Sequence, residues 1–227
     1  WRDAGERMYL PTDAHTDIHP QDADFLSKRP WDLANTPPDH FPLLLHYHPL
    51  NLYRHQVIKQ ADVLLAMFLI SEHFSTEEMK RNFDYYDPLT THDSSLSVCI
   101  QSIIAAEIGY MDKAKEYFDF ALSMDLGDVG GNMMQGAHIA SIGGTWLALV
   151  YGFGGMRDRG GAISFRPRLP EEWRRLRFPL TVRGSRFTVD ITAQQTTYTL
   201  ETGDGLSLTH RGETLNLSPM APTVSRA

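Results

Sequence analysis

The chain has 227 residues, of which 42% are hydrophobic and 22% are charged, a composition typical of globular domains. No apolar run approaches the length that crosses a bilayer, and no N-terminal signal pattern is present, so we expect a cytoplasmic protein without a membrane partner. Cys99 is the only cysteine, which excludes an intrachain disulfide and a thiolate metal site. We expect it to be a small buried hydrophobic residue.

Charge is distributed unevenly along the chain, although the net charge is only -7. Residues 1–155 hold 10 Lys and Arg against 21 Asp and Glu, whereas residues 156–227 hold 11 against 7. This shift predicts two domains. The basic excess of the second part is too small and too scattered to indicate binding to nucleic acid.

The segment from Met8 to Pro49 is rich in proline, aspartate and histidine and shows little helical or strand periodicity. Its aromatic residues argue against disorder, so we predict a long ordered loop that lines a polar site. His46 and His48 belong either to this site or to the core. No helix aligns the histidines of this segment, and no third ligand has a defined spacing, so no metal site is expected.

Leu52 to Ile70 is predicted to form a helix, because apolar residues recur along it at helical spacing. Lys59 and Gln60 stand among these apolar positions. They form either a solvated helix face, which is the usual role of such residues, or the mouth of a pocket that grips polar groups of a ligand.

A polar loop enters a helix in the middle of the chain. A predicted helix over residues 75–83 starts with a capping box and stops at an Asp-Pro pair. The pattern over residues 96–107 is again helical, which places His92, Ser94 and Ser95 at a helix N-terminus. Either the polar side chains here cap the first turn, or they join the unpaired N–H groups and the helix dipole in an anion pocket.

A further predicted helix over residues 137–151 contains a cluster of small residues. Glycine pairs destabilise helix interiors, so Gly143 and Gly144 indicate a break or the very close approach of a neighbour or ligand. His138, Ser141 and Thr145 lie near one face of this helix, at positions i, i+3 and i+7. His138 is either a satisfied core histidine or part of the same contact.

The predicted helices, including one over residues 111–123, form consecutive antiparallel pairs that fit an α/α toroid or an α-solenoid. No fixed-period repeat is visible, which disfavours the solenoid. After residue 155 the pattern changes to short alternating segments, which predict an antiparallel β unit belonging to a sandwich. The strands are expected at residues 162–167, 180–191 with a turn at Gly184-Ser185, 196–201, 206–209 and 214–217, followed by a tail from Ser218 to Ala227.

Several motifs occur in order along the chain. They are Ile18-His19-Pro20-Gln21-Asp22, Leu45-His46-Tyr47-His48-Pro49-Leu50, Val57-Ile58-Lys59-Gln60-Ala61-Asp62-Val63, Tyr86 through Ser97, His138-Ile139-Ala140-Ser141-Ile142-Gly143-Gly144-Thr145-Trp146, Val150-Tyr151-Gly152-Phe153-Gly154-Gly155-Met156-Arg157 and Phe165-Arg166-Pro167-Arg168-Leu169-Pro170. Through them the chain, up to about Ile191, resembles the C-terminal part of enzymes of glycoside hydrolase family 65. This is the family of maltose, trehalose, kojibiose and nigerose phosphorylases.

The resemblance implies an α+β multidomain protein. Residues 1–157 would be the C-terminal portion of an (α/α)6 helical barrel, the catalytic domain, and residues 158–227 a small antiparallel β-sandwich domain. It also implies inverting phosphorolysis of an α-glucosyl disaccharide, in which a glutamic acid protonates the glycosidic oxygen while phosphate attacks the anomeric carbon to give β-glucose 1-phosphate. That general acid is expected upstream of Trp1, so the resemblance implies a fragment that is inactive alone.

Carried over by position, Lys59 and Gln60 would bind hydroxyls of the glucosyl unit in the −1 subsite. Two other segments would form a phosphate cradle, in which glycines let backbone N–H groups approach the anion. The implied phosphate-binding residues are His92, Ser94, Ser95, His138, Gly143, Gly144 and Thr145. The implied partners are the disaccharide, inorganic phosphate as co-substrate and a second copy of the enzyme in a homodimer. No metal and no organic cofactor is implied.

Two alternatives stay open. A hydrolase of the same family, of the acid trehalase type, would replace the phosphate cradle with a carboxylate base that activates water. A non-catalytic carbohydrate-binding fragment would hold a sugar or an anion without reaction. An upstream segment that carries the general acid would distinguish the two enzymes from the binding fragment.

Overall fold

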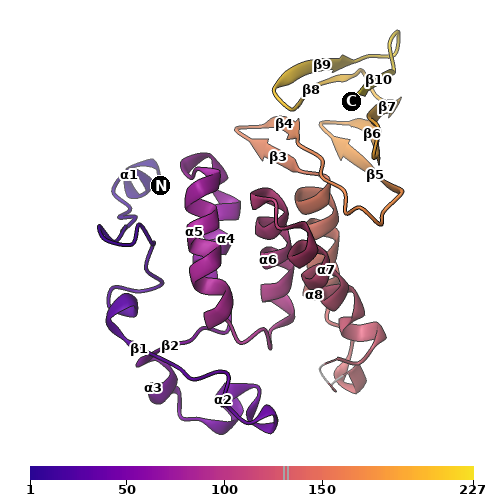
Figure 1. Ribbon diagram of the computed structural model, residues 1–227. Helices are drawn as coiled ribbons and strands as arrows, with labels where there is room; N and C mark the ends of the chain where they lie inside the picture. Colours follow the sequence, from indigo (N-terminus) through magenta and orange to yellow (C-terminus); the bar gives the residue numbers. More distant parts are fainter. Residues whose placement is uncertain (130, 132) are drawn as a thin grey trace.

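The computed structural model describes residues 1–129, 131 and 133–227 of the chain. A row of helices leads into a β-sandwich at one end of the row (Figure 1). An extended N-terminal arm runs along the opposite side of the row and below it. The helices and sheets that the sequence predicts are therefore both present, in the predicted order.

The first 61 residues form an extended arm that short helical turns interrupt, and the long loop predicted from Met8 to Pro49 lies within it. Ile18 and Phe25 are buried and join the core of the helices. The hydroxyl of Tyr86 donates to the carbonyl of His19 at 2.6 Å, so the arm is fastened to the helix that carries Tyr86. The elements of the arm are α1 (Arg2–Glu6), η1 (Phe25–Ser27), β1 (Arg29–Pro30), η2 (Pro38–His40), α2 (Leu43–His46), α3 (Pro49–Leu52) and β2 (His55–Gln56).

The helices of the row follow the arm. They are α4 (Asp62–Leu69), α5 (Thr76–Tyr86), α6 (Ser95–Ile108), α7 (Met111–Leu126) and α8 (Ile139–Leu147), with the 3-10 turns η3 (Ser71–His73), η4 (Asp87–Leu89) and η5 (Met133–Gln135) between them. The predicted capping box of α5 is confirmed, because Glu78 N donates to Ser75 Oγ at 3.2 Å and Ser75 N donates to Glu78 Oε2 at 2.7 Å. Helix α6 is central, and its apolar residues 103–106 are 0% exposed.

The prediction of one helix over Leu52–Ile70 is wrong in its first half. Between α3 and α4 the chain is extended, with β2 paired in parallel to β1 and Ile58 bridged to Thr90. Hydrogen bonds to neighbouring segments satisfy the backbone there, so the tertiary context overrides the local helical pattern. Lys59 and Gln60 consequently stand on a loop that enters α4 rather than on a helix face.

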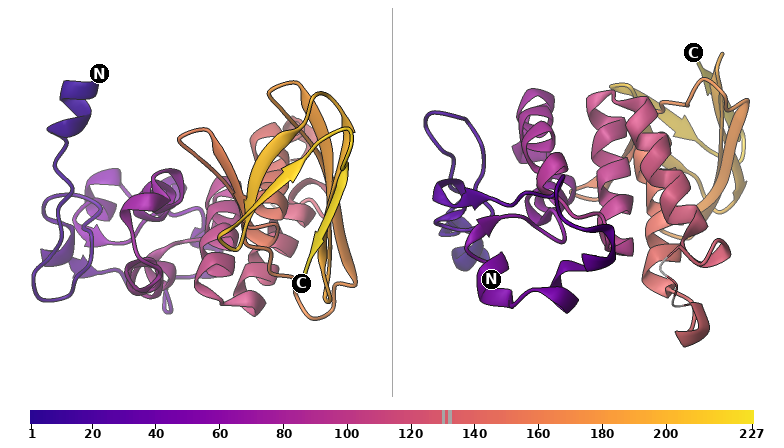
Figure 2. Two further views of the ribbon diagram at one scale, coloured as in Figure 1. Left: turned by 90° about the horizontal axis from the view of Figure 1, so that it is seen from above. Right: turned by 60° about the horizontal axis from the view of Figure 1, so that its bottom comes forward.

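Helices α4, α6 and α8 run in the same direction, because α5 and α7 return the chain between them (Figures 1 and 2). The segments that enter α4 and α6 lie side by side, as the parallel Ile58–Thr90 bridge shows. Helices α6 and α8 also run in the same direction, side by side. A Cβ on Gly144 would lie 2.5 Å from Cys99 Sγ, and further along both segments one on Gly152 would lie 3.4 Å from Ile103 Cα. The N-terminal ends of all three helices therefore lie at the same end of the row.

A glycine-rich turn joins the helices to the sandwich. Helix α8 continues into a π-helical turn, η6 (Ala148–Phe153), and Gly155 then adopts a φ of 60° with a Cβ position only 2.0 Å from Arg166 O. No other residue fits this close approach. Buried Arg157 pairs with Glu107 of α6 at 2.8 Å, and burial lowers the pKa of its guanidinium. This ion pair fastens the sandwich to the central helix.

The sandwich consists of two four-stranded sheets, ordered β10-β7-β6-β5 and β3-β4-β8-β9. Phe165, Phe187 and Tyr198 are 0% exposed between the sheets. The strands are β3 (Met156–Arg159), β4 (Ala162–Phe165), β5 (Arg175–Val182), β6 (Ser185–Thr192), β7 (Thr196–Thr202), β8 (Leu206–His210), β9 (Glu213–Leu217) and β10 (Thr223–Arg226).

Two expectations about the sandwich are corrected. Strands β4 and β8 pair in parallel, so the domain is not wholly antiparallel. The predicted C-terminal tail contains β10, which pairs with β7 from Thr223 to Arg226. The partly buried Val224 packs against the core there, and short edge strands of this kind carry too little hydrophobic alternation to be recognised locally.

Candidate functional site

The site is built where the loops entering α4 and α6 are joined. Ile58 N donates to Leu89 O at 2.9 Å, and Thr91 N donates to Ile58 O at 2.9 Å. One turn into α6, Ser97 Oγ donates to the carbonyl of Lys59 at 3.1 Å. These bonds hold the Lys59-Gln60 pair directly beside the N-terminus of α6.

Gln60 and Ser94 make the direct contact between the two predicted segments. Gln60 Nε2 donates to Ser94 Oγ at 2.9 Å. Ser94 is buried and is the N-cap of α6, where its hydroxyl also accepts from Leu96 N at 3.4 Å. Ser94 therefore does cap α6, which is the ordinary role of such a serine. The same hydroxyl also contacts Gln60 of the neighbouring segment. Ser95 is the first residue of α6, so its N–H is one of those without an intrahelical partner.

Lys59 faces a polar cavity of about 360 Å³ between the N-terminal arm and the start of α4. Asp22, Gln60 and Asp62 line the same cavity, and Asp62 Oδ2 accepts from Gln21 Nε2 at 3.1 Å. Among the described residues no carboxylate lies within salt-bridge distance of the exposed ammonium of Lys59, whereas Lys28 of the same cavity pairs with Asp22 at 2.6 Å. The cavity thus offers a free cation, amides and carboxylates together, a mixture that suits sugar hydroxyls.

The arm histidines have contacts within the arm. His46 stacks on His40 with ring centroids 5.2 Å apart, and His48 caps α3 by accepting from Leu50 N at 3.2 Å. In the part of the chain that the structure describes, no group of three or more His, Cys, Asp or Glu side chains is arranged to hold a metal ion.

His92 is held against α7 by a network around Asp87. It has a left-handed backbone with φ of 56°, its ring stacks on Tyr117 at 5.3 Å, and its Nε2 lies 3.2 Å from the carbonyl of Asp87. The buried carboxylate of Asp87 accepts from Lys113 and Tyr117, and burial raises the pKa of the Tyr117 hydroxyl, as does this hydrogen bond. The network fixes the shape of the loop that leads into α6.

His138 is the N-cap residue of α8 and is held by Asp125 at the end of α7. Its Nδ1 lies 2.6 Å from Asp125 Oδ1, and its backbone N donates to Asp125 Oδ2 at 2.9 Å. The two hydrogen bonds from His138 lower the pKa of the Asp125 carboxyl. Nothing in the sequence pattern singles out Asp125, because the contact spans a loop.

Gly143, Gly144 and Thr145 lie inside α8, where backbone N–H groups bond to carbonyls of the preceding turn. The prediction that the two glycines expose free backbone N–H groups is therefore wrong. Gly144 permits the contact between α8 and Cys99, and Thr145 Oγ1 donates to Ser141 O at 2.9 Å within the helix. Gly143 is exposed, with open space where a Cβ would stand.

Unpaired polar atoms gather around this site. Buried side-chain atoms without a hydrogen-bond partner include Thr91 Oγ1, His92 Nδ1, Asp93 Oδ1 and Ser141 Oγ. Buried polar groups are normally paired, so such a cluster indicates that further groups come into contact here. Sequence reasoning placed Ser141 on one helix face with His138 and Thr145 but did not include it among the phosphate-binding residues.

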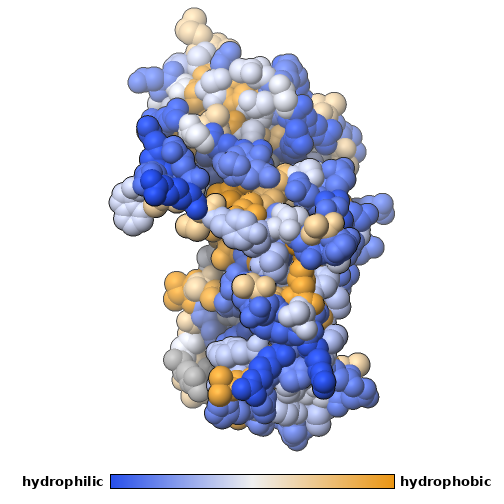
Figure 3. Space-filling model, turned by 90° about the vertical axis from the view of Figure 1, so that its left-hand side faces the viewer, coloured by the Kyte–Doolittle hydropathy of each residue, from blue (hydrophilic) through white to orange (hydrophobic). Residues whose placement is uncertain are grey.

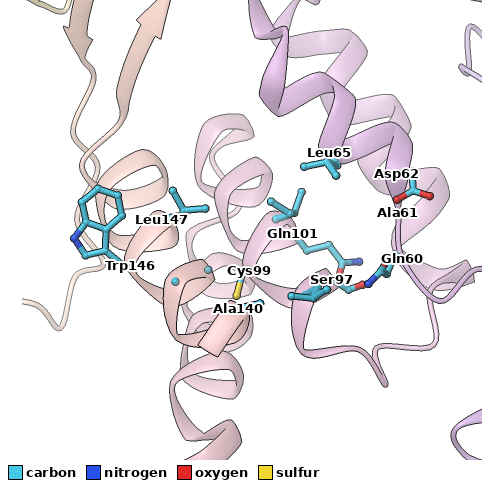
Figure 4. A pocket seen from close by; sticks show the side chains of 14 residues that line it. Gln60, Ala61, Asp62, Leu65, Ser97, Cys99, Gln101, Ala140, Trp146 and Leu147 are labelled. Carbon is cyan, nitrogen blue, oxygen red and sulfur yellow. The ribbon is translucent and has the colours of Figure 1, made fainter. Parts of the chain in front are cut away.

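Below the site, an apolar cavity of about 570 Å³ separates α4, α6 and α8 (Figure 4). Gln60 and Ser97 stand at its α4 side, Trp146 at its α8 side, and Cys99 between them. Burial raises the pKa of the Cys99 thiol to about 11, so this group is neutral. Most of the lining is apolar, and the polar side chains among the lining residues include those of Gln60, Asp62, Ser97 and Gln101.

None of the helices that the structure describes is both long and apolar enough to cross a bilayer. Residues 1–147 match the glycosyl hydrolase family 65 central catalytic domain, and residues 156–217 match the C-terminal domain of that family. The α,α-trehalose phosphorylases of Geobacillus stearothermophilus and Thermoanaerobacter brockii are 45% and 49% identical over 98% and 92% of the chain. The matched parts are 29% and 27% of those proteins, so the chain spans less than a third of their length.

A solved structure also matches the chain over its whole length. A human-microbiome protein provisionally named kojibiose phosphorylase covers 100% of the chain with 33% of its own, at a TM-score of 0.89 and 32% identity.

Proposed function

The chain belongs to glycosyl hydrolase family 65, and from this we propose that it is the C-terminal part of an inverting phosphorylase that splits an α-glucosyl disaccharide. In the proposed reaction phosphate attacks the anomeric carbon from the face opposite the glycosidic bond. The bond to the leaving sugar breaks, that sugar takes a proton from a glutamic acid outside this chain, and β-glucose 1-phosphate forms. Phosphate is already an anionic nucleophile, so the protein must position it rather than deprotonate water.

The parallel packing of α6 and α8, which places both of their N-termini at the same end of the row, is the observation that carries this proposal. Helix N-termini expose N–H donors and a positive dipole end, and two of them on one side of the molecule favour an anion. Ser94, Ser95 and His138 stand at these two ends. Unpaired Ser141 Oγ near the start of α8 supplies a further hydroxyl. We assign the phosphate to this place, with Gly143, the exposed small residue, bordering it.

Lys59 and Gln60 are assigned to the glucosyl unit of the same substrate. The hydrogen bond from Gln60 to Ser94 joins the two parts of the site, so a sugar gripped by Gln60 would present its anomeric carbon near the α6 N-terminus. The polar cavity in front of Lys59 supplies room and hydroxyl partners. Holding the sugar and the phosphate in a fixed relative geometry lowers the activation barrier of the displacement.

We propose that the helices complete an (α/α)6 barrel with the rest of the enzyme. Large apolar residues of α8 are uncovered, with Ile139 73% exposed, Ile142 54% and Trp146 46%. On the other side of the row, which carries the N-terminal arm, Figure 3 shows small groups of hydrophobic side chains within a largely hydrophilic face. The boundary between residues 157 and 158, the homodimer, the cytoplasmic location and the absence of a metal or organic cofactor remain predictions.

Hydrolysis is the second candidate, and Asp93 favours it. Its Oδ1 is buried without a partner next to Ser94, and a free carboxylate there could activate water. Two relatives named trehalose phosphorylases make α,α-trehalose the first disaccharide to test. The complete enzyme should consume trehalose only with phosphate, and Ser94→Ala should raise the KM for phosphate more than that for the sugar. Glucose release at an equal rate without phosphate would establish hydrolysis instead.

A further inference from the structure

Asp125 accepts hydrogen bonds from His138 through both of its carboxylate oxygens. One carboxylate oxygen accepts from the imidazole Nδ1 at 2.6 Å, and the other accepts from the backbone N of the same residue at 2.9 Å. Asp125 comes from the end of α7 and His138 precedes α8, so this pair of hydrogen bonds fixes how α8 begins. The side chains are 19% and 28% exposed, which shields the pair from much of the competing water.

We propose that Asp125 is a positioning residue for phosphate, acting through His138; this rests on the proposed function. The carboxylate takes the Nδ1 hydrogen and so fixes the ring orientation with Nε2 directed away from Asp125. A phosphate oxygen accepts hydrogen bonds, so with Nδ1 directed to Asp125 the phosphate is bound by a hydrogen donated from Nε2.

The surroundings of His138 leave this role to Asp125. Helix α6 presents the neutral thiol of Cys99 to α8, and α7 presents Asp125. In the described part of the chain no other carboxylate pairs with His138. Carboxylates commonly orient metal-binding histidines in the same way, through one ring nitrogen, and leave the second nitrogen for the metal.

The test compares Asp125→Asn with wild type in the complete enzyme. The carboxamide keeps the size of the side chain but loses the charge. We expect the KM for phosphate to rise about tenfold, the scale of one charge-assisted hydrogen bond, with the KM for the disaccharide changed less than about twofold. Asp119→Asn is the matched control, because Asp119 lies on the same helix and pairs with Lys115 at 2.6 Å on the surface.

Three further variants separate this inference from the proposed function. His138→Ala should raise the KM for phosphate, and adding Asp125→Asn to it should raise that KM much less than Asp125→Asn does alone. The ring is then gone, and only the hydrogen bond from the backbone N at position 138 to Asp125 is left to lose. Asp125→Glu retains the charge and should recover part of the loss, which a purely structural role does not predict. If His138→Ala raises the KM for phosphate but Asp125→Asn does not, the positioning role is wrong. If His138→Ala itself leaves the KM for phosphate unchanged, the phosphate assignment of His138 fails first.

Discussion

Helix α8 holds two adjacent glycines in opposite environments, and they make a matched pair for mutation. A Cβ on Gly144 would stand 2.5 Å from Cys99 Sγ and 2.9 Å from Cys99 Cβ, and both groups are buried. A Cβ on Gly143 would meet nothing within 4 Å. Alanine at either position gains the same helix propensity, about 1 kcal/mol over glycine. The difference between the variants therefore isolates the steric cost.

Overpacking of a close-packed interface costs about 1–3 kcal/mol. We expect Gly143→Ala to be as stable as wild type or more stable by up to about 1 kcal/mol. Gly144→Ala should be less stable than Gly143→Ala by about 1–3 kcal/mol, because α8 must shift away from α6 to accommodate the methyl group. Since that shift carries His138 with it, the KM for phosphate should rise in Gly144→Ala as well.

The assay is urea and thermal unfolding of the complete enzyme, followed by circular dichroism. The two alanine variants are compared directly under one condition. Cys99→Ala supplies a second check, because it removes the sulfur nearest the added methyl and should reduce the cost of Gly144→Ala. If the two alanine variants are equally stable, the close α6–α8 contact is not the reason for glycine at position 144.

Three other outcomes are expected. Lys59→Ala should raise the KM for the disaccharide and leave that for phosphate nearly unchanged in initial-rate assays; unaltered sugar kinetics would remove Lys59 from the site. Glu107→Gln leaves the buried guanidinium of Arg157 uncompensated and should lower stability by about 3–5 kcal/mol in urea unfolding, whereas a loss below about 1 kcal/mol would show the pair to be incidental. Burial lowers the pKa of His210, so the unfolded state binds more protons and stability should fall as the pH drops below about 6.5. His210→Gln should reduce that slope in thermal scans across this range, and an unchanged slope would contradict the assignment.

Local patterns predicted most of the helices and strands. The capping box at Ser75 marked the start of α5, and the alternation over residues 180–191 marked a hairpin, because both signals depend only on neighbouring residues. The loop before α4 escaped prediction for the opposite reason. Its apolar residues repeat at helical spacing, but the partners that hold it extended, β1 and Thr90, are distant in the sequence.

The site shows the same limit. The residues at the N-terminus of α6 were found from capping chemistry and motif order, and the structure brings Gln60 into contact with Ser94. The glycines of α8 were expected to expose N–H groups, whereas Gly144 instead lets a helix pass close to Cys99. Asp125 could not be found at all, because its contact with His138 depends on how the loop after α7 folds back.

Product analysis of the complete enzyme tests the central claim most directly. Trehalose, maltose, kojibiose and nigerose would each be incubated with and without inorganic phosphate, and the sugar products identified by anomer-resolved NMR. Phosphate-dependent formation of β-glucose 1-phosphate from one of them is the predicted result. Free glucose appearing at the same rate without phosphate would contradict it, and the N-termini of α6 and α8 would then need another ligand.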